Sequence, residues 1–151
     1  LTNPFGGRLN RITRFAGRRF SSMLLSPTVP IRSPLLERDA ENLSRALKRF
    51  GVSVERLLAK YREEIVDRQY QLGRIADCAI ELYLNACILR RLDALLEDSA
   101  SNGIDGQREL AVARYWLATS YRRIDGNLKS LWDNDDEATT AVADAALQIS
   151  K

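Results

Sequence analysis

The strongest constraint on the fold is a row of apolar residues that recurs at alternating steps of four and three between residues 36 and 61. The members of this row are Leu36, Ala40, Leu43, Leu47, Phe50, Val54, Leu57 and Tyr61. Such spacing places every member on one side of an α-helix, as at the a and d positions of a heptad repeat. Ser33 followed by Pro34 is a good helix start, because serine caps helix N-termini and proline is favoured at the first helical position. We therefore predict a helix from residue 34 to residue 61.

The second predicted helix begins near Asp67 and ends near Asp98, and it is apolar on most sides. Its predicted contact row is Leu72, Ile75, Ala79, Leu82, Ala86 and Leu89, and its further apolar residues are Cys78, Ile80, Tyr83, Leu84, Cys87 and Ile88. Such a helix is expected in the middle of a bundle. Asp77, Glu81 and Asn85 form one polar row along it. We interpret this row as a solvated face rather than a carboxylate site, because neither a histidine nor a second carboxylate-bearing helix accompanies it.

Two more helices complete the predicted body. Residues 99–106 form a Ser/Asn/Gly-rich loop. The helix after it has a contact row of Leu110, Ala113, Leu117, Tyr121, Ile124, Leu128 and Leu131. Trp116 and Trp132 flank this row, and we interpret them as packing residues. Residues 133–136 make a turn and an acidic N-cap for a last helix over 137–149. The predicted fold class is therefore all-α: an up-and-down bundle of about four helices.

Composition excludes several kinds of active site. The 151 residues include no histidine, so a Ser-His-Asp or Cys-His centre cannot be built within this chain. The chain also lacks a Gly-rich phosphate loop and a Glu-x-x-His metal motif. Residues 133–136 resemble the start of a calcium loop, but the glycine and the distal glutamate of an EF-hand are missing. We expect no catalytic, cofactor-binding or metal-binding residues here.

Cysteine usage favours a reducing compartment. Cys78 and Cys87 are nine residues apart in one predicted helix, so their side chains project in opposite directions and cannot form a disulfide with each other. Both lie among apolar residues, and we expect both to be buried free thiols. No apolar run reaches the 18 residues that a membrane span needs. The chain begins with Leu1 rather than methionine, and we take it to be a piece of a longer protein.

Residues 1–33 form a basic arm with a proline-rich linker. Residues 1–36 contain six arginines and no acidic residue, although the whole chain has 20 acidic residues. Residues 8–25 have helical spacing, with Leu9, Ile12, Ala16, Phe20 and Met23 on one face and Arg8, Arg11, Arg14, Arg18 and Arg19 on the others. Such an amphipathic basic helix suits the surface of an anionic membrane. Docking on the rest of a larger protein is the alternative, and nucleic acid is a distant third.

Residues 26–34 contain three prolines and are expected to be extended, so they separate the arm from the body. We accordingly divide the chain into residues 1–33, the arm and linker, and residues 34–151, the helical bundle.

Two stretches of sequence carry a resemblance to a known family. One is the turn Leu1-Thr2-Asn3-Pro4-Phe5-Gly6. The other runs from Glu64 to Tyr83 and on to Arg91, and its polar residues Asp67, Gln69, Arg74, Asp77 and Tyr83 agree along with its apolar ones. These stretches resemble the C-terminal appendage of very-long-chain acyl-CoA dehydrogenases and of acyl-CoA dehydrogenase family member 9. The resemblance covers essentially the whole chain, although the last 20 or so residues match poorly.

The resemblance implies a non-catalytic part of a flavoenzyme. In this family, FAD and a glutamate base located upstream dehydrogenate a fatty acyl-CoA, and electrons pass to electron-transferring flavoprotein. The parent protein is then expected to be a homodimer in the bacterial cytoplasm or the mitochondrial matrix, peripheral on the inner membrane. The basic first segment is associated with membrane attachment in the family. The family member specialised for respiratory-complex assembly uses this region for protein partners, which keeps the docking alternative open.

Overall fold

The computed structural model describes residues 27–98 and 105–149. Along the chain these residues form the 3-10 turn η1 (Pro34–Leu36), helix α2 (Glu37–Tyr61), the 3-10 segment η2 (Arg62–Asp67), and helices α3 (Gln69–Asp98), α4 (Asp105–Ser130) and α5 (Asp136–Ile149). Within the described residues there are four α-helices and no strand. The prediction of an all-α fold is confirmed.

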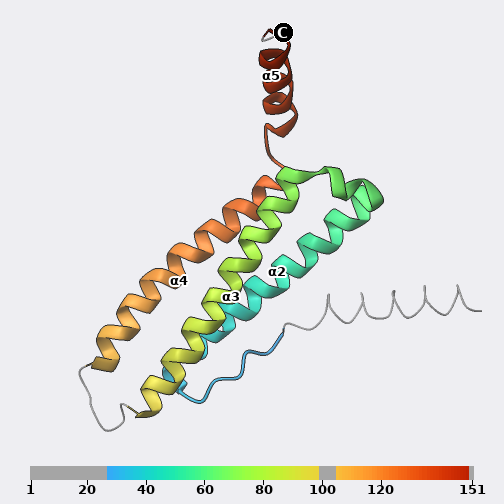
Figure 1. Ribbon diagram of the computed structural model, residues 1–151. Coiled ribbons are helices and arrows are strands. Elements are labelled where there is room, and N and C mark those ends of the chain that lie inside the picture. The colour runs from blue at the N-terminus through green and yellow to red at the C-terminus, as the bar shows by residue number, and fades with distance from the viewer. Residues whose placement is uncertain (1–26, 99–104, 150–151) are drawn as a thin grey trace, which may run out of the picture.

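Helices α2, α3 and α4 lie side by side and alternate in direction (Figure 1). Two ion pairs between α2 and α4 define their relative direction, because Asp39 pairs with Arg114 and Arg49 pairs with Asp125. Sequence number therefore rises the same way along both helices. Helix α3 runs antiparallel to them, as the predicted up-and-down order requires.

The start of the first helix is as predicted, but Ser33 stabilises it in another way. Pro34 is the first residue of η1, which leads directly into α2. The side chain of Ser33 makes no capping hydrogen bond. Instead, the backbone N–H of Ser33 donates to Asp93 Oδ1 on α3 at 2.8 Å, and the N–H of Arg32 donates to the same carboxylate at 2.9 Å. The start of the first helix is thus fixed by hydrogen bonds between the linker and α3.

The predicted N-cap of the second helix was wrong by one residue, because Arg68 rather than Asp67 precedes the first helical residue. Asp67 is the last residue of η2, and α3 begins at Gln69. Helix α2 ends at Tyr61 because Arg62 adopts φ 49°, a left-handed conformation that breaks the helix. The chain then continues in 3-10 turns, and the N–H of Arg68 donates to the carbonyl of Ile65 at 3.1 Å. These turns occupy the residues between the two predicted helices.

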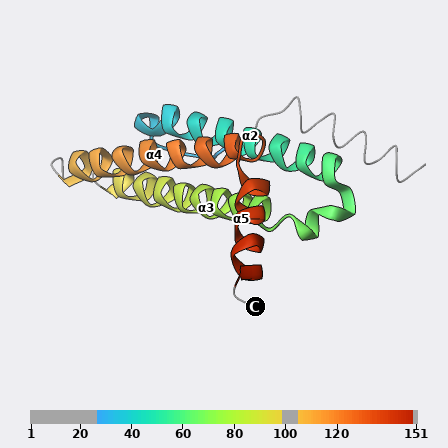
Figure 2. The same ribbon diagram turned by 90° about the horizontal axis from the view of Figure 1, so that it is seen from above.

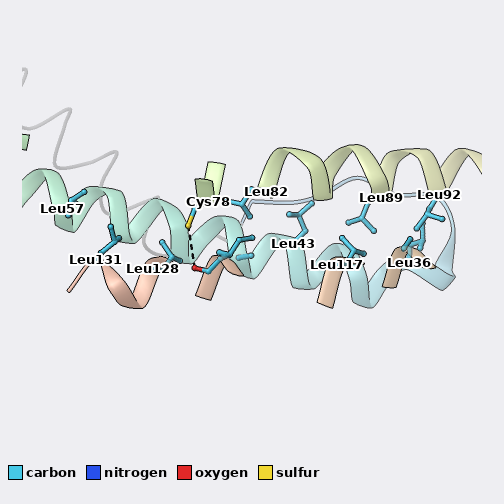
Figure 3. Packing of buried hydrophobic residues seen from close by; sticks show 13 residues of the cluster. Leu36, Leu43, Leu57, Cys78, Leu82, Leu89, Leu92, Leu117, Leu128 and Leu131 are labelled. Carbon is cyan, nitrogen blue, oxygen red and sulfur yellow. Dashed lines mark hydrogen bonds between the residues drawn. The ribbon is translucent and has the colours of Figure 1, made fainter. Parts of the chain in front are cut away.

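The core lies between α2, α3 and α4 (Figure 3). Its largest fully buried apolar side chains are Leu36, Leu43, Leu57, Leu89, Ile124, Leu131 and Cys78. The predicted rows of α2 and α4 supply much of this core, which confirms them. Burial of each leucine or isoleucine contributes about 1.5–3 kcal/mol.

The contact row predicted for α3 was partly wrong. Ala79 and Ala86 are exposed, whereas Cys78 and Asn85 are fully buried. Leu82 and Leu89 are common to the predicted and the observed row. Because α3 is apolar on most sides, several rows of residues could face the core, and only its two neighbouring helices select one of them.

Helix α5 leaves the end of the bundle instead of packing along it (Figure 1). Seen from above, it passes α3 and points away from α2 (Figure 2). Asp136 is its one buried residue among those whose side chains are described. The predicted span of 137–149 agrees with the structure within one residue. The fourth helix therefore exists, but three helices make the described core.

The described part of the linker, residues 27–33, is extended and lies on the bundle. Val29 and Ile31 are partly buried against the core. Pro27 and Thr28 line one surface hollow with Ser44 and Arg45, so the linker runs back along α2 from η1. The arm itself, residues 1–26, lies outside the described residues.

Candidate docking surface

The predicted membrane or partner contacts lie outside the described residues and are not placed. These residues are Arg8, Leu9, Arg11, Ile12, Arg14, Arg18, Arg19, Phe20 and Met23. Their role remains a prediction.

The outer side of α3 carries an apolar stripe. Ile80, Tyr83, Leu84 and Cys87 follow one another at helical steps of three, one and three, and all four are exposed. Tyr83 is 70% exposed and Ile80 is 58% exposed. Near 100° per residue, this stripe lies opposite the buried residues Leu82 and Leu89. Helix α3 therefore presents one apolar face to the core and another to its surroundings.

Helix α4 extends this surface. Val112, Tyr115 and Trp116 are exposed, with Tyr115 at 74%. Val112 and Trp116 line a hollow of about 300 Å³ together with Ile88 and Leu92 of α3. We call the residues Ile80, Tyr83, Leu84, Cys87, Ile88, Val112, Tyr115 and Trp116 the α3–α4 face. Exposed large apolar side chains gathered on neighbouring helices are typical of a protein or membrane contact.

An ion pair at the edge of the α3–α4 face holds Trp116 in place. Arg123 donates from Nε and from its terminal nitrogen to the two carboxylate oxygens of Glu81, at 2.5 and 2.9 Å. The hydrogen bonds from Arg123 lower the pKa of Glu81 below its usual value. The same guanidinium lies 5.0 Å from the centre of the Trp116 ring, which is a cation–π distance. A ring fixed before binding loses less side-chain entropy on docking.

The interpretation of the polar row on α3 as a solvated face was wrong for one member and incomplete for another. Asp77 is exposed, as expected, but Glu81 is paired and Asn85 is fully buried. Neither amide atom of Asn85 has a hydrogen-bond partner among the described residues. Ser120 of α4 is likewise fully buried, and its hydroxyl has no partner there. Asn85 occupies a core position because α4 packs on that side of α3.

The tryptophans are less buried than packing residues are expected to be. Trp116 is 39% exposed and Trp132 is 37% exposed. Arg56 and Lys60 of α2 lie 5.0 and 5.5 Å from the centre of the Trp132 ring. Both indoles therefore lie at the surface under positively charged side chains.

One of the two cysteine predictions was wrong. Cys78 is fully buried, and its Sγ contacts the carbonyl of Ile124 at 3.8 Å (Figure 3). Burial raises the pKa of the Cys78 thiol to about 11, so it is protonated at neutral pH. Cys87 is exposed on the α3–α4 face. Its apolar neighbours in sequence indicated a core, but they form the outer stripe instead.

The described residues hold no group of three or more histidine, cysteine, aspartate or glutamate side chains that could bind a metal ion. None of the described helices is both long enough and apolar enough to cross a membrane. What the α3–α4 face offers chemically is apolar contact, including the exposed rings of Tyr83, Tyr115 and Trp116.

The described residues form a small all-helical domain with a core between three helices and an exposed, largely apolar α3–α4 face. The chain belongs to the family described as ACAD9/ACADV, C-terminal domain, whose model matches residues 34–151. The resemblance to the C-terminal part of very-long-chain acyl-CoA dehydrogenases is thereby confirmed.

Three curated relatives support this assignment. The chain is 33% identical over 104 residues to the mitochondrial very long-chain specific acyl-CoA dehydrogenase of Rattus norvegicus, covering 69% of this chain and 15% of the relative. It is 32% identical over 138 residues to the Mus musculus enzyme and 31% identical over 137 residues to the Homo sapiens enzyme. Each of these two matches covers 87% of this chain and 20% of the relative. The chain thus spans a fifth or less of the length of these relatives.

Proposed function

We propose that this chain is the non-catalytic C-terminal domain of a FAD-dependent very-long-chain acyl-CoA dehydrogenase, and that its α3–α4 face docks on the rest of that polypeptide. The observation that carries the proposal is the outward stripe of Ile80, Tyr83, Leu84 and Cys87, continued by Val112, Tyr115 and Trp116. Since the chain covers about a fifth of its relatives, most of the polypeptide lies outside it. A covalent tether keeps that remainder at high effective concentration.

Among the described residues, the glycines do not provide a phosphate-binding loop for a flavin. Gly51, Gly73 and Gly126 all lie inside helices, so none of them forms a loop that could cradle a phosphate. In the proposed enzyme, FAD and the base that removes the substrate proton belong to the upstream part. Transfer of electrons to electron-transferring flavoprotein, homodimer formation and a mitochondrial matrix location belong to the same proposal, and the names of the relatives support the location.

The test uses the thiol of Cys87 as a probe of the covered face in the intact enzyme. If the α3–α4 face is docked, Cys87 reacts slowly with a maleimide reagent in the native protein. Ile80→Glu places a charge in the contact, so we expect it to speed labelling of Cys87 at least tenfold, since burying a charge against apolar surface costs several kcal/mol. Val66→Glu is the matched control, because Val66 is 63% exposed but lies on η2, away from the α3–α4 face.

Rapid labelling of Cys87 in the unmodified enzyme would contradict the docking proposal. So would equal labelling rates in the Ile80→Glu and Val66→Glu proteins. Helical circular dichroism of both variants checks that the domain remains folded, which is expected because both side chains are exposed.

We propose as a second function that the arm brings the enzyme to an anionic membrane. The observation in its favour is the segregation of charge in the sequence, with six arginines and no acidic residue in residues 1–36. Each arginine near an anionic surface contributes about 1 kcal/mol. Apolar side chains on the opposite face, such as Leu9 and Phe20, add about 1.5–3 kcal/mol each when they are buried.

Sedimentation with vesicles tests the membrane proposal in the intact enzyme. The triple variant Arg11→Glu, Arg14→Glu and Arg18→Glu is expected to lose binding to anionic vesicles, and the native protein should lose it at high salt. The control triple variant replaces Arg38, Arg90 and Arg108 with glutamate, because these three arginines are exposed on the bundle. Equal partitioning of the two triple variants would show that the arm is not the membrane element.

A further inference from the structure

The end of the chain has a charge pattern opposite to that of the arm. Residues 133–150 contain five acidic side chains and no lysine or arginine. Of these, Asp136 is held by Arg74, whereas Asp135, Glu137 and Asp144 are exposed and have no ion-pair partner among the described residues. Helix α5 also exposes apolar side chains, with Val142 at 71%. It is therefore an acidic, partly apolar helix that is held at Asp136, and its side chains over residues 137–147 are all exposed.

A cleft opens at the base of α5. It has a volume of about 1,110 Å³, and its apolar lining includes Tyr61, Tyr70, Trp132, Ala138 and Ala141. The carboxylates of Asp135, Glu137 and Asp144 line it from the α5 side. We call this hollow the α5 cleft. Its apolar surface and acidic wall suit an amphipathic helix that has arginines on its polar side.

Two cations on the far wall limit which part of the cleft such a helix can occupy. Lys60 and Arg68 lie 4.8 and 4.9 Å from the centre of the Tyr61 ring, and Asp67 lines the cleft with them. An arginine-rich helix is repelled by these cations and attracted by the carboxylates of α5. Because Arg56 and Lys60 also lie over the Trp132 ring, the favoured position is along α5, away from that ring.

We propose that the arm of a second copy of this chain occupies the α5 cleft when the arm is not on a membrane, because the same arginines and apolar side chains serve both contacts. The arm is the complementary segment of the sequence: Arg8, Arg11, Arg14, Arg18 and Arg19 match the acidic wall, and Leu9, Ile12, Phe20 and Met23 match the apolar lining. Exchange of arms between two copies makes two such contacts. Each is small, so the association is salt-sensitive and reversible.

The distance between Pro27 and the α5 cleft favours the arm of a second copy over the arm of the same chain. Pro27 lies beside Ser44 and Arg45 on α2, and the 16 residues from Arg45 to Tyr61 span about 24 Å of helix. A same-chain arm crosses that distance by extending about seven residues, which covers residues 20–26. That extension removes Phe20 and Met23 from the apolar side of the arm. The arm of another copy is free of this constraint.

Cross-linking between two tagged forms of the intact protein tests the proposal. In a Cys87→Ser background, one form carries Ala16→Cys in the arm and the other carries Val142→Cys on α5. After co-expression, a short bis-maleimide is expected to join the two forms into a product of twice the chain mass. Adding Glu137→Arg and Asp144→Arg to the α5 form is expected to reduce this product at least about tenfold, by replacing attraction with repulsion. Asp136 is left unchanged because it holds the base of α5.

A charge swap separates the proposed contact from accidental proximity. When Arg11→Glu and Arg14→Glu are added to the Ala16→Cys form, we expect cross-linking to the form with Val142→Cys, Glu137→Arg and Asp144→Arg to be restored. Asp77→Arg, an exposed reversal on α3, is the control and should have no effect. A product that forms equally in all variants overturns the proposal, and so does the absence of any two-chain product. A last check uses a single chain that carries both Ala16→Cys and Val142→Cys. If the reagent joins these two cysteines within one chain, the arm lies on its own α5 and the proposal is overturned.

Discussion

The ion pair between Arg74 and Asp136 holds the base of α5, and its removal has a calculable effect. Both terminal nitrogens of Arg74 donate to the carboxylate of Asp136 at 2.6 Å, and Gln71 Nε2 donates to it at 3.1 Å. The side chains of Arg74 and Asp136 are only 20% and 11% exposed. A bidentate, charge-assisted pair with this burial contributes about 1–3 kcal/mol. Asp136 also lies in the first turn of α5, where a negative charge contributes about 0.3–1 kcal/mol.

We expect Asp136→Asn to lower the free energy of unfolding by about 1–3 kcal/mol at neutral pH. A double-mutant cycle with Arg74→Gln should give a coupling energy of at least about 1 kcal/mol. The assay is urea unfolding followed by circular dichroism and by Trp132 fluorescence in a Trp116→Phe background. Lys129 and Asp133 form the control pair, because they are 77% and 76% exposed and 3.4 Å apart. The same cycle there should give less than about 0.5 kcal/mol.

The pH dependence of the Arg74–Asp136 pair has a definite sign. Hydrogen bonds from Arg74 hold the pKa of Asp136 below its usual value. The pair therefore stabilises the fold fully above the unfolded-state pKa, near 3.9, and this stability is lost as the pH falls through the lower folded-state pKa. The stability difference between the native protein and Arg74→Gln should be constant near pH 7 and shrink below about pH 4. A coupling energy near zero would refute this reasoning, and so would a stability difference between the native protein and Arg74→Gln that does not change as the pH is lowered.

Two further predictions concern buried polar and thiol groups. Asn85→Leu should raise the free energy of unfolding by about 1–3 kcal/mol, because the amide is fully buried without a hydrogen-bond partner among the described residues; thermal unfolding measures the effect, and a lower melting temperature would contradict it. In the isolated chain, Cys87 should react with a thiol reagent at pH 8 while Cys78 reacts only on unfolding, because Cys78 is buried with its pKa raised to about 11. Mass spectrometry of labelled peptides distinguishes the two thiols, and early modification of Cys78 would contradict its burial.

Much of the fold could be predicted from local patterns. The start at Pro34, the apolar row of α2 and the existence of α5 all follow from spacing and capping, which act within a few turns of chain. The η2 turns were not predictable in the same way. Their position depends on Arg62 with φ 49° and on where α3 must begin to pack against α2.

The candidate docking surface was harder to predict than the fold. The sequence contains both apolar faces of α3, but spacing alone assigned Cys87 and Tyr83 to a bundle interior. A signal was present in the stripe from Ile80 to Cys87, which lies opposite Leu82 and Leu89 on a helical wheel. It became interpretable only when three helices, rather than four, were found to surround the core.

The sequence by itself determined that the chain is helical, where most helices lie, and that positive charge collects at one end and negative charge at the other. These properties depend on residue type and on spacing within one helix. The tertiary structure decided which side of α3 is covered, that Asn85 is buried, and that α5 stands apart from the bundle. The physical reason is that burial depends on contacts between residues far apart in the chain, and a helix that is apolar on two sides does not specify which side its neighbours will cover.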